Sequence, residues 1–164
     1  MNPPSGELLI LDVSSSAIGY CVLFPEEGKI EPGRTIQLKG KVLSDRLAQI
    51  ATLVGRLTVR RGLTGMVIES PIPARSLKSI RACYGAWGAA VGSFVEATGL
   101  PVWCVFPSSW QSAVAQRKWV KGEDRKAACH RWCGCDDFDI GEDSKDAYCI
   151  AVALLSKPQI AEGV

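Results

Sequence analysis

Four acidic residues stand where their side chains could meet at a single site. Asp12 and Glu69 each end an apolar run, and Asp143 and Asp146 are three residues apart in a segment with helical spacing. Residues three apart on a helix share one face, about one turn apart. Carboxylate oxygens are the ligands that Mg²⁺ prefers, and a pair of such ions can hydrolyse a phosphodiester bond. We interpret the four acids as candidate catalytic residues and metal ligands.

Each acid also has a structural interpretation. Asp12 precedes three serines and could serve a turn, and Asp143 could be stabilised by the dipole at a helix start. Asp146 could pair with Lys145 or another neighbouring base. Glu69 is the hardest to explain in this way, because it follows three apolar residues and precedes Ser-Pro. The occurrence of all four acids at the ends of elements favours a shared chemical role.

The hydrophobic pattern predicts the elements that must position these acids. Strands are expected at residues 8–13, 18–24, 34–39, 66–69 and 100–105. Helices are expected at residues 42–59, 76–97, 123–132 and 143–155, with a short helix capped by Ser108 and loops at 25–33 and 116–122. This order predicts an α/β fold with a mixed five-stranded sheet, three antiparallel strands followed by parallel ones, flanked by helices.

Length and composition agree with a packed core. The chain has 164 residues, 47% of them hydrophobic, which suits one domain spanning residues 1–164. The N-terminus does not resemble a signal peptide, and no apolar run reaches the ~18 residues that a membrane span requires. Seven cysteines, an odd number, suggest reduced thiols. We therefore expect a cytoplasmic protein without a membrane span.

Charge is unevenly distributed along the chain. Residues 70–135 hold nine Lys or Arg and three acids, whereas residues 136–146 hold six acids and one Lys. A basic surface can hold DNA phosphates while acids hold the cations, although solvated surface charge is the alternative. The candidate DNA-binding residues are Arg75, Lys78, Arg81, Arg117, Lys118, Lys121, Arg125 and Lys126. Trp119 could stack on a base or cover the core.

Two further groups of residues carry open interpretations. Gly85, Gly88 and Gly92 lie in the long helix, where each glycine costs about 1 kcal/mol relative to alanine. Close approach of the sheet or of a second subunit would offset that cost. The group Cys129, His130, Cys133 and Cys135 suggests zinc, but adjacent residues on a helix diverge and the usual paired spacing is absent. We therefore do not expect a zinc site there.

Segments along most of the chain resemble the RuvC-type Holliday junction resolvases. LILDVSSSAIGYCVL resembles their first hairpin, VIES their second motif and EDSKDAYCIAVAL their last motif. ACYGAWGAAVG, PSSWQSAV and KGEDRKA are also similar, and all these segments occur in the family's order. The resemblance implies the ribonuclease H-like fold and crossover junction endodeoxyribonuclease activity.

The same resemblance implies cofactors, partners and roles. Two Mg²⁺ ions per site, replaceable by Mn²⁺, would activate a water and stabilise the leaving 3′ oxygen, giving nicks with a 5′ phosphate. Asp12 would bridge the ions, Glu69 would bind one, and Asp143 and Asp146 the other. The partners would be branched DNA, above all four-way junctions, and a second subunit through the long helix. No small-molecule cofactor is expected.

The sequence also departs from the bacterial pattern. Ile72 is the junction-centre candidate, at a position where bacterial enzymes often carry an aromatic residue, and Val13-Ser14 replaces Pro-Gly. The pattern is closer to phage or other divergent members, so a bacterial or phage-infected cytoplasm is expected. Lys121, Arg125 and Lys126 are equal candidates for neutralising the phosphate. The alternatives are a nuclease for structured RNA and an inactive module that binds branched DNA.

Overall fold

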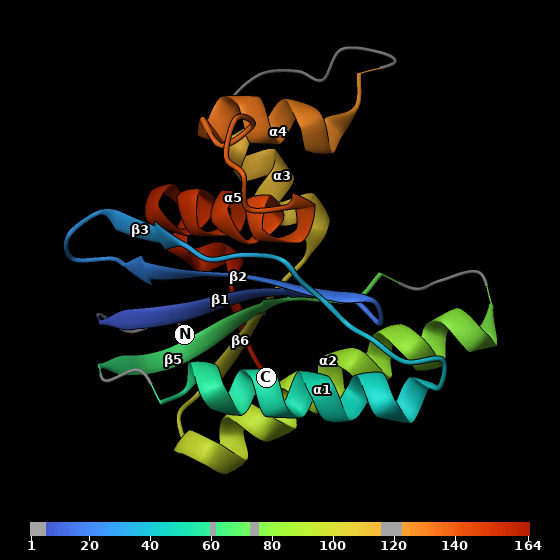
Figure 1. The fold of residues 1–164 in the computed structure, drawn as a ribbon. Coiled ribbons are helices and arrows are strands. Elements are labelled where there is room, and N and C mark those ends of the chain that lie inside the picture. Colours follow the sequence, from blue (N-terminus) through green and yellow to red (C-terminus); the bar gives the residue numbers. More distant parts are fainter. Residues whose placement is uncertain (1–5, 60–61, 73–75, 116–122) are drawn as a thin grey trace.

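A twisted mixed sheet lies between two groups of helices in the computed structural model of the protein (Figure 1). The structure describes residues 6–59, 62–72, 76–115 and 123–164. Its strands are β1 (Glu7–Val13), β2 (Ala17–Phe24), β3 (Lys29–Pro32), β4 (Ile36–Gln37), β5 (Leu63–Glu69), β6 (Val102–Val105) and β7 (Glu162–Gly163). Its helices are α1 (Leu43–Leu57), α2 (Leu77–Thr98), α3 (Pro107–Val114), α4 (Arg125–Cys133) and α5 (Glu142–Ser156), followed by the 3₁₀ helix η1 (Pro158–Ile160).

Strand β1 is the centre of the sheet. The strand order is β3-β2-β1-β5-β6-β7, with β4 pairing to β2 beside this path. β1 runs antiparallel to β2 and parallel to β5, and β5 runs parallel to β6. Five consecutive residues of β1 are buried, as expected for a strand that is covered on both faces. The mixed α/β fold predicted from the sequence is confirmed.

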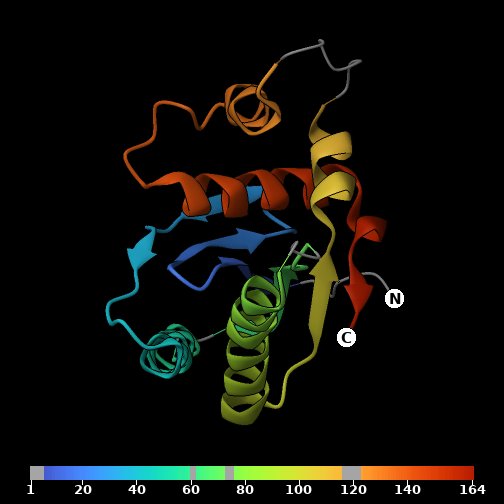
Figure 2. The ribbon, with the colours of Figure 1, turned by 90° about the vertical axis from the view of Figure 1, so that its right-hand side faces the viewer.

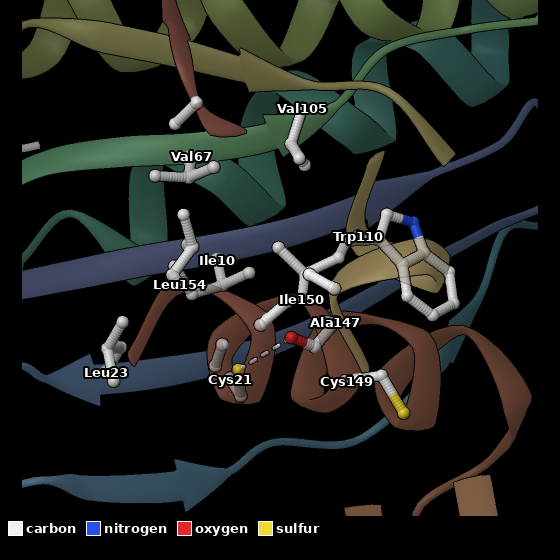
Figure 3. Packing of buried hydrophobic residues seen from close by; sticks show 14 of the residues in the cluster. Ile10, Cys21, Leu23, Val67, Val105, Trp110, Ala147, Cys149, Ile150 and Leu154 are labelled. Carbon is white, nitrogen blue, oxygen red and sulfur yellow. Dashed lines mark hydrogen bonds between the residues drawn. The ribbon is translucent and has the colours of Figure 1, made fainter. Parts of the chain in front are cut away.

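Two hydrophobic clusters hold the helices to the sheet. Leu9 and Leu11 of β1 face the side covered by α1 and α2, where Phe94 is fully buried. Leu8 and Ile10 face the opposite side, where they pack with residues of α3 and α5. Figure 3 shows this second cluster, and Figure 2 shows α4 stacked on the outer side of α5. No helix among the described residues is both long and apolar enough to cross a bilayer.

Several expected boundaries were wrong at the sheet edges. The expected loop at residues 25–33 contains β3, and the expected strand at 34–39 is reduced to the two residues of β4. The described sheet therefore has seven strands and not five, because β3 and the C-terminal β7 were not expected. These short strands are half-exposed or exposed, so they lack the apolar alternation that marks a buried strand. Helix α3 begins at Pro107, which needs no N–H partner, and not after a Ser108 cap.

Gly19 of β2 brings the first turn of α5 against the sheet. A Cβ at this position would lie 2.0 Å from the Asp143 carbonyl carbon and 2.3 Å from the Ser144 nitrogen. The contact is continued by hydrogen bonds, because the Tyr20 N–H donates to Ser144 Oγ and the Ser144 N–H donates to Thr35 Oγ1. The start of α5 is thus fixed to strand β2.

Replacing Gly19 by alanine should separate α5 from β2. The added methyl meets backbone atoms, which cannot rotate away, so we expect a loss of about 1–3 kcal/mol in the free energy of unfolding. Urea unfolding followed by circular dichroism measures this loss. Gly55→Ala in α1 is the matched control, because a Cβ there meets nothing within 4 Å and alanine favours a helix. Equal stability of Gly19→Ala and wild type would contradict this account of the packing.

Candidate active site

The structure brings the four predicted acids to one end of the sheet. Asp12 and Glu69 come from the neighbouring parallel strands β1 and β5, in which Leu11 lies opposite Ile68, so both strands end at the same edge. Asp143 and Asp146 lie at the start of α5, which packs on β1 and β2. Asp12 is 7% exposed and Asp146 only 1%, so the cluster is set into the protein and does not lie on its surface.

Asp12 interacts electrostatically with the other three carboxylates. Burial raises the pKa of Asp12 well above its ordinary value, and the charges of Glu69, Asp146 and Asp143 raise it further. The pKa of Asp143 is also raised, by burial and then by the charge of Asp146. Like charges held together in a site of low dielectric disfavour one another's ionised form. The site therefore favours a bound cation.

Glu69 is held by a tryptophan from the next helix. Trp110 of α3 is fully buried, and its Nε1–H donates to Glu69 Oε1 at 2.7 Å. Burial raises the pKa of Glu69, while the hydrogen bond from Trp110 acts in the opposite direction. Trp110 packs in the core cluster shown in Figure 3, together with Ala147 and Ile150 of α5.

Asp146 is held by two residues of α4. His130 Nε2 lies 2.8 Å from Asp146 Oδ1, and Lys126 Nζ donates to Asp146 Oδ2. Burial alone would lower the pKa of Lys126, but the charge of Asp146, their hydrogen bond and the charges of Asp12 and Glu69 raise it overall. The hydrogen bond to Asp146 likewise raises the pKa of His130. Helix α4 thus supplies a positive charge, on Lys126, that offsets part of the negative charge of the acids.

Trp110 and His130 belong to the site although their sequence positions did not predict it. His130 was weighed only with the cysteines, yet it lies four residues after Lys126, and such residues share a helix face. That spacing was the available signal. A buried indole N–H generally needs an acceptor, but nothing in the sequence indicated that the acceptor of Trp110 is Glu69. Cys135 faces Cys149 instead, with the two sulfur atoms 3.8 Å apart.

The other predicted residues are placed only in part. Arg75, Arg117, Lys118, Lys121 and Trp119 lie outside the described residues. Lys78 and Arg81 are exposed at the start of α2, and Arg125 is exposed at the start of α4. Ile72, three residues after Glu69, is 65% exposed.

The three glycines of α2 have different surroundings. A Cβ on Gly85 would meet Leu47 of α1 at 3.4 Å, so this glycine faces a neighbouring helix of the same chain. A Cβ on Gly88 or Gly92 would meet nothing within 4 Å. Only the last two therefore lie on an open part of the helix.

The chemistry of these side chains fits a hard divalent ion. Four carboxylates from three elements face one another, and their mutual repulsion would be relieved by positive charge. Among the described residues, no group of three or more His, Cys, Asp or Glu has the arrangement of a formed metal site. Lys126 occupies Oδ2 of Asp146, the oxygen that His130 leaves free.

A cavity of about 420 Å³ opens beside Asp143. It lies between the segment around β4 and the loop before α5, which are joined by a hydrogen bond from the Thr35 N–H to the Ile140 carbonyl at 2.7 Å. The other residues that line it are Arg34, Gln37, Asp139, Gly141 and Glu142. Of the four acids, Asp143 therefore borders this cavity.

Comparison with solved structures identifies the fold. Thermus thermophilus RuvC in complex with a Holliday junction substrate matches with a TM-score of 0.75 and 17% identity, over 96% of this chain and 99% of that one. A second Thermus thermophilus RuvC structure matches with a TM-score of 0.72 and 18% identity over the same shares. No family model and no curated protein matches the sequence. The chain thus has the ribonuclease H-like fold of RuvC, as the sequence resemblance predicted.

The raised pKa of Asp12 predicts how stability depends on pH in EDTA. The folded protein holds a proton that the unfolded chain loses above its ordinary pKa of 3.8, so the free energy of unfolding should fall as the pH rises beyond that value. Asp12→Asn removes one of the repelling charges. It should reduce this slope and stabilise the protein at pH 7.

Urea unfolding at pH 4 to 8, with EDTA throughout, tests this prediction. Glu26→Gln, which removes an exposed charge in the turn after β2, is the control and should leave the slope unchanged. A variant Asp12→Asn that is less stable than wild type at pH 7 would show that the Asp12 charge is not repelled in the folded state.

Proposed function

We propose that the protein is a divalent-metal-dependent endonuclease that resolves four-way DNA junctions. The observation that carries this proposal is the convergence of Asp12, Glu69, Asp143 and Asp146, at the ends of β1 and β5 and the start of α5. The fold supports it, because one of the similar structures is RuvC with a Holliday junction substrate. Fold alone does not define an activity, so the proposal rests on the site.

The four carboxylates would hold Mg²⁺, or Mn²⁺ in its place. When bound, a pair of such ions supplies an activated water and stabilises the leaving 3′ oxygen, so that the product is a nick with a 5′ phosphate. Asp12 lies within the electrostatic reach of the other three acids, which suits the bridging role that the resemblance implies. The burial of Asp12 and Asp146 keeps water from competing for these oxygens.

Lys126 is our choice among the three basic candidates for transition-state stabilisation. Its side chain contacts Asp146 and acts electrostatically on Asp12 and Glu69. Arg125 is exposed one residue earlier, and Lys121 lies outside the described residues. A divalent ion on Asp146 would free the Lys126 ammonium to neutralise the phosphate as it reacts.

We further propose that the protein acts as a homodimer on branched DNA. A four-way junction has near two-fold symmetry, and its resolution needs two nicks that a dimer with two-fold symmetry can make. Gly88 and Gly92 of α2 face open space and would allow close approach of a second helix. Lys78 and Arg81, exposed on the first turns of the same helix, would contact the phosphate backbone.

The carboxylates are tested by cleavage and binding measured separately. Asp12→Asn, Glu69→Gln and Asp146→Asn should abolish cutting of labelled four-way DNA in Mg²⁺, yet bind it as tightly as wild type, because they remove negative charge that faces phosphates. Gels with four-way DNA, duplex DNA and hairpin RNA, each in Mg²⁺ and in EDTA, measure both properties. Full activity of Asp12→Asn, or cutting in EDTA, would contradict the assignment. If only the hairpin RNA were cut, the protein would be a nuclease for structured RNA and not for DNA junctions.

Lys126 and Lys78 should differ in the step that they affect. Lys126→Met should lower kcat by about 10²–10³, the usual cost of losing one electrostatic stabiliser, with little change in junction affinity. Lys78→Met should instead weaken binding and reduce the salt dependence of affinity by about one ion, with kcat unchanged. Single-turnover cleavage and binding titrations at two salt concentrations separate the two effects. A Lys126→Met variant with wild-type kcat would exclude Lys126 from catalysis.

A further inference from the structure

Two ring N–H groups reach the carboxylates from helices that carry none of the four acids. Trp110 on α3 donates to Glu69, and His130 on α4 lies against Asp146. Both rings are buried, Trp110 fully and His130 with 4% of its surface exposed. The question is what these donors do for the carboxylates that they contact.

The bond from Trp110 can have only one direction. An indole N–H donates and cannot accept, so it holds Glu69 Oε1 as an acceptor at 2.7 Å. The ring cannot turn away, because it is enclosed in the core cluster with Val105 and Ile150 (Figure 3). The start of α3 is fixed as well, since the backbone N–H of Trp110 donates to the carbonyl of Phe106, the residue directly after β6. One oxygen of Glu69 is therefore fixed by a rigid group.

His130 holds Asp146 in a comparable way. A carboxylate oxygen can only accept, so Nε2 carries the proton in this contact. The ring is enclosed between α4 and α5, and its Nδ1 lies 3.6 Å from Oε2 of the exposed Glu142. The His130 carbonyl accepts from the Cys135 N–H at 3.0 Å, which ties the end of α4 to the following turn.

The two donors on Asp146 differ in mobility. The Lys126 side chain is 54% exposed and long, whereas the His130 ring is enclosed, and the two occupy different oxygens of Asp146. Lys126 can be displaced from Oδ2 by another cation without exposing buried surface. His130 cannot leave Oδ1 without opening the contact between α4 and α5. The orientation of the Asp146 carboxylate is therefore set by His130.

We propose that Trp110 and His130 are positioning residues that fix one oxygen each of Glu69 and Asp146 and thereby keep the second oxygen of each carboxylate available to a divalent ion. This inference rests on the proposed function of the same site. A carboxylate that is already oriented loses less rotational freedom when an ion binds, so its affinity for the ion is higher. Neither residue needs to touch DNA or the reacting atoms.

Mn²⁺ binding without DNA is the readout, because it does not depend on cleavage. Titration followed by the electron paramagnetic resonance of free Mn²⁺ gives the affinity. We expect Trp110→Phe and His130→Met to weaken Mn²⁺ binding by about 10- to 100-fold, the usual cost of losing such a partner. His130→Gln keeps an amide N–H at a similar reach and should stay within about threefold of wild type.

Trp103→Phe is the matched control for Trp110→Phe. Trp103 is a second buried tryptophan of the same core cluster, on β6, and it does not contact a carboxylate of the site. Its replacement should lower the melting temperature and leave Mn²⁺ affinity unchanged. Circular dichroism confirms folding, and if His130→Met does not fold, Trp110→Phe against Trp103→Phe decides the proposal.

The outcomes separate the two levels of the proposal. Wild-type Mn²⁺ affinity in both Trp110→Phe and His130→Met would overturn the positioning roles and leave the nuclease proposal intact. An equal loss of Mn²⁺ affinity in His130→Gln and His130→Met would show that the His130 ring only fills space and does not orient the Asp146 carboxylate. A wild-type protein that neither binds Mn²⁺ nor cuts junction DNA would overturn the proposed function, and the inference with it.

Discussion

Repulsion among four carboxylates is the constraint on which the rest of this structure depends. The charge of Asp146 acts on Asp12, Glu69 and Asp143 and raises the pKa of each, and Asp12 and Asp146 are almost fully buried. A chain free to rearrange would move these charges into water. They stay together because each is attached to an element that has no alternative position: the central strand β1, its parallel neighbour β5 and a helix fixed against β2 at Gly19. The hydrophobic packing of the sheet offsets the electrostatic cost of the site.

Three residues around the acids lower the electrostatic cost that the hydrophobic packing must offset. Trp110 and His130 each give a hydrogen bond to one acid, and Lys126 adds a positive charge. Helix α4 is held at its start by Asp124, which accepts from the Lys126 and Ala127 backbone N–H groups, and it ends at Gly134 in a left-handed conformation. This short helix is capped at both ends although it has little apolar character, and two of its nine residues contact Asp146. Helix α4 packs on the outer side of α5 and holds Asp146 from there, while the sheet holds Asp12 and Glu69 from the other side.

The sequence predicted the parts of the molecule that depend on periodicity. The buried hairpin of β1 and β2, the strand that ends at Glu69 and the helices α1, α2 and α5 carry apolar patterns, and their placement agrees with the structure to within a few residues. Strands β3 and β7 could not be found in this way, and β4 was expected to be longer, because these strands are held by backbone hydrogen bonds to better buried neighbours. The four acids were identifiable because two lie where apolar strands end and two lie one turn apart at the start of an apolar helix. Trp110 and His130 were not, because their partners are 41 and 16 residues away and become neighbours only through the fold.

Low sequence identity and a shared fold are compatible for the same physical reason. A core accepts many apolar residues of suitable volume, so at 17% identity the sheet and helices can still superpose over nearly the whole chain. A charged site has fewer solutions, because each buried carboxylate needs a donor or a cation within hydrogen-bond reach. In this chain the donors are an indole from α3 and an imidazole and an ammonium from α4. A replacement at one of these three positions must therefore still supply a donor or a cation to the same acid, whereas other side chains of α3 and α4 can change without disturbing the sheet.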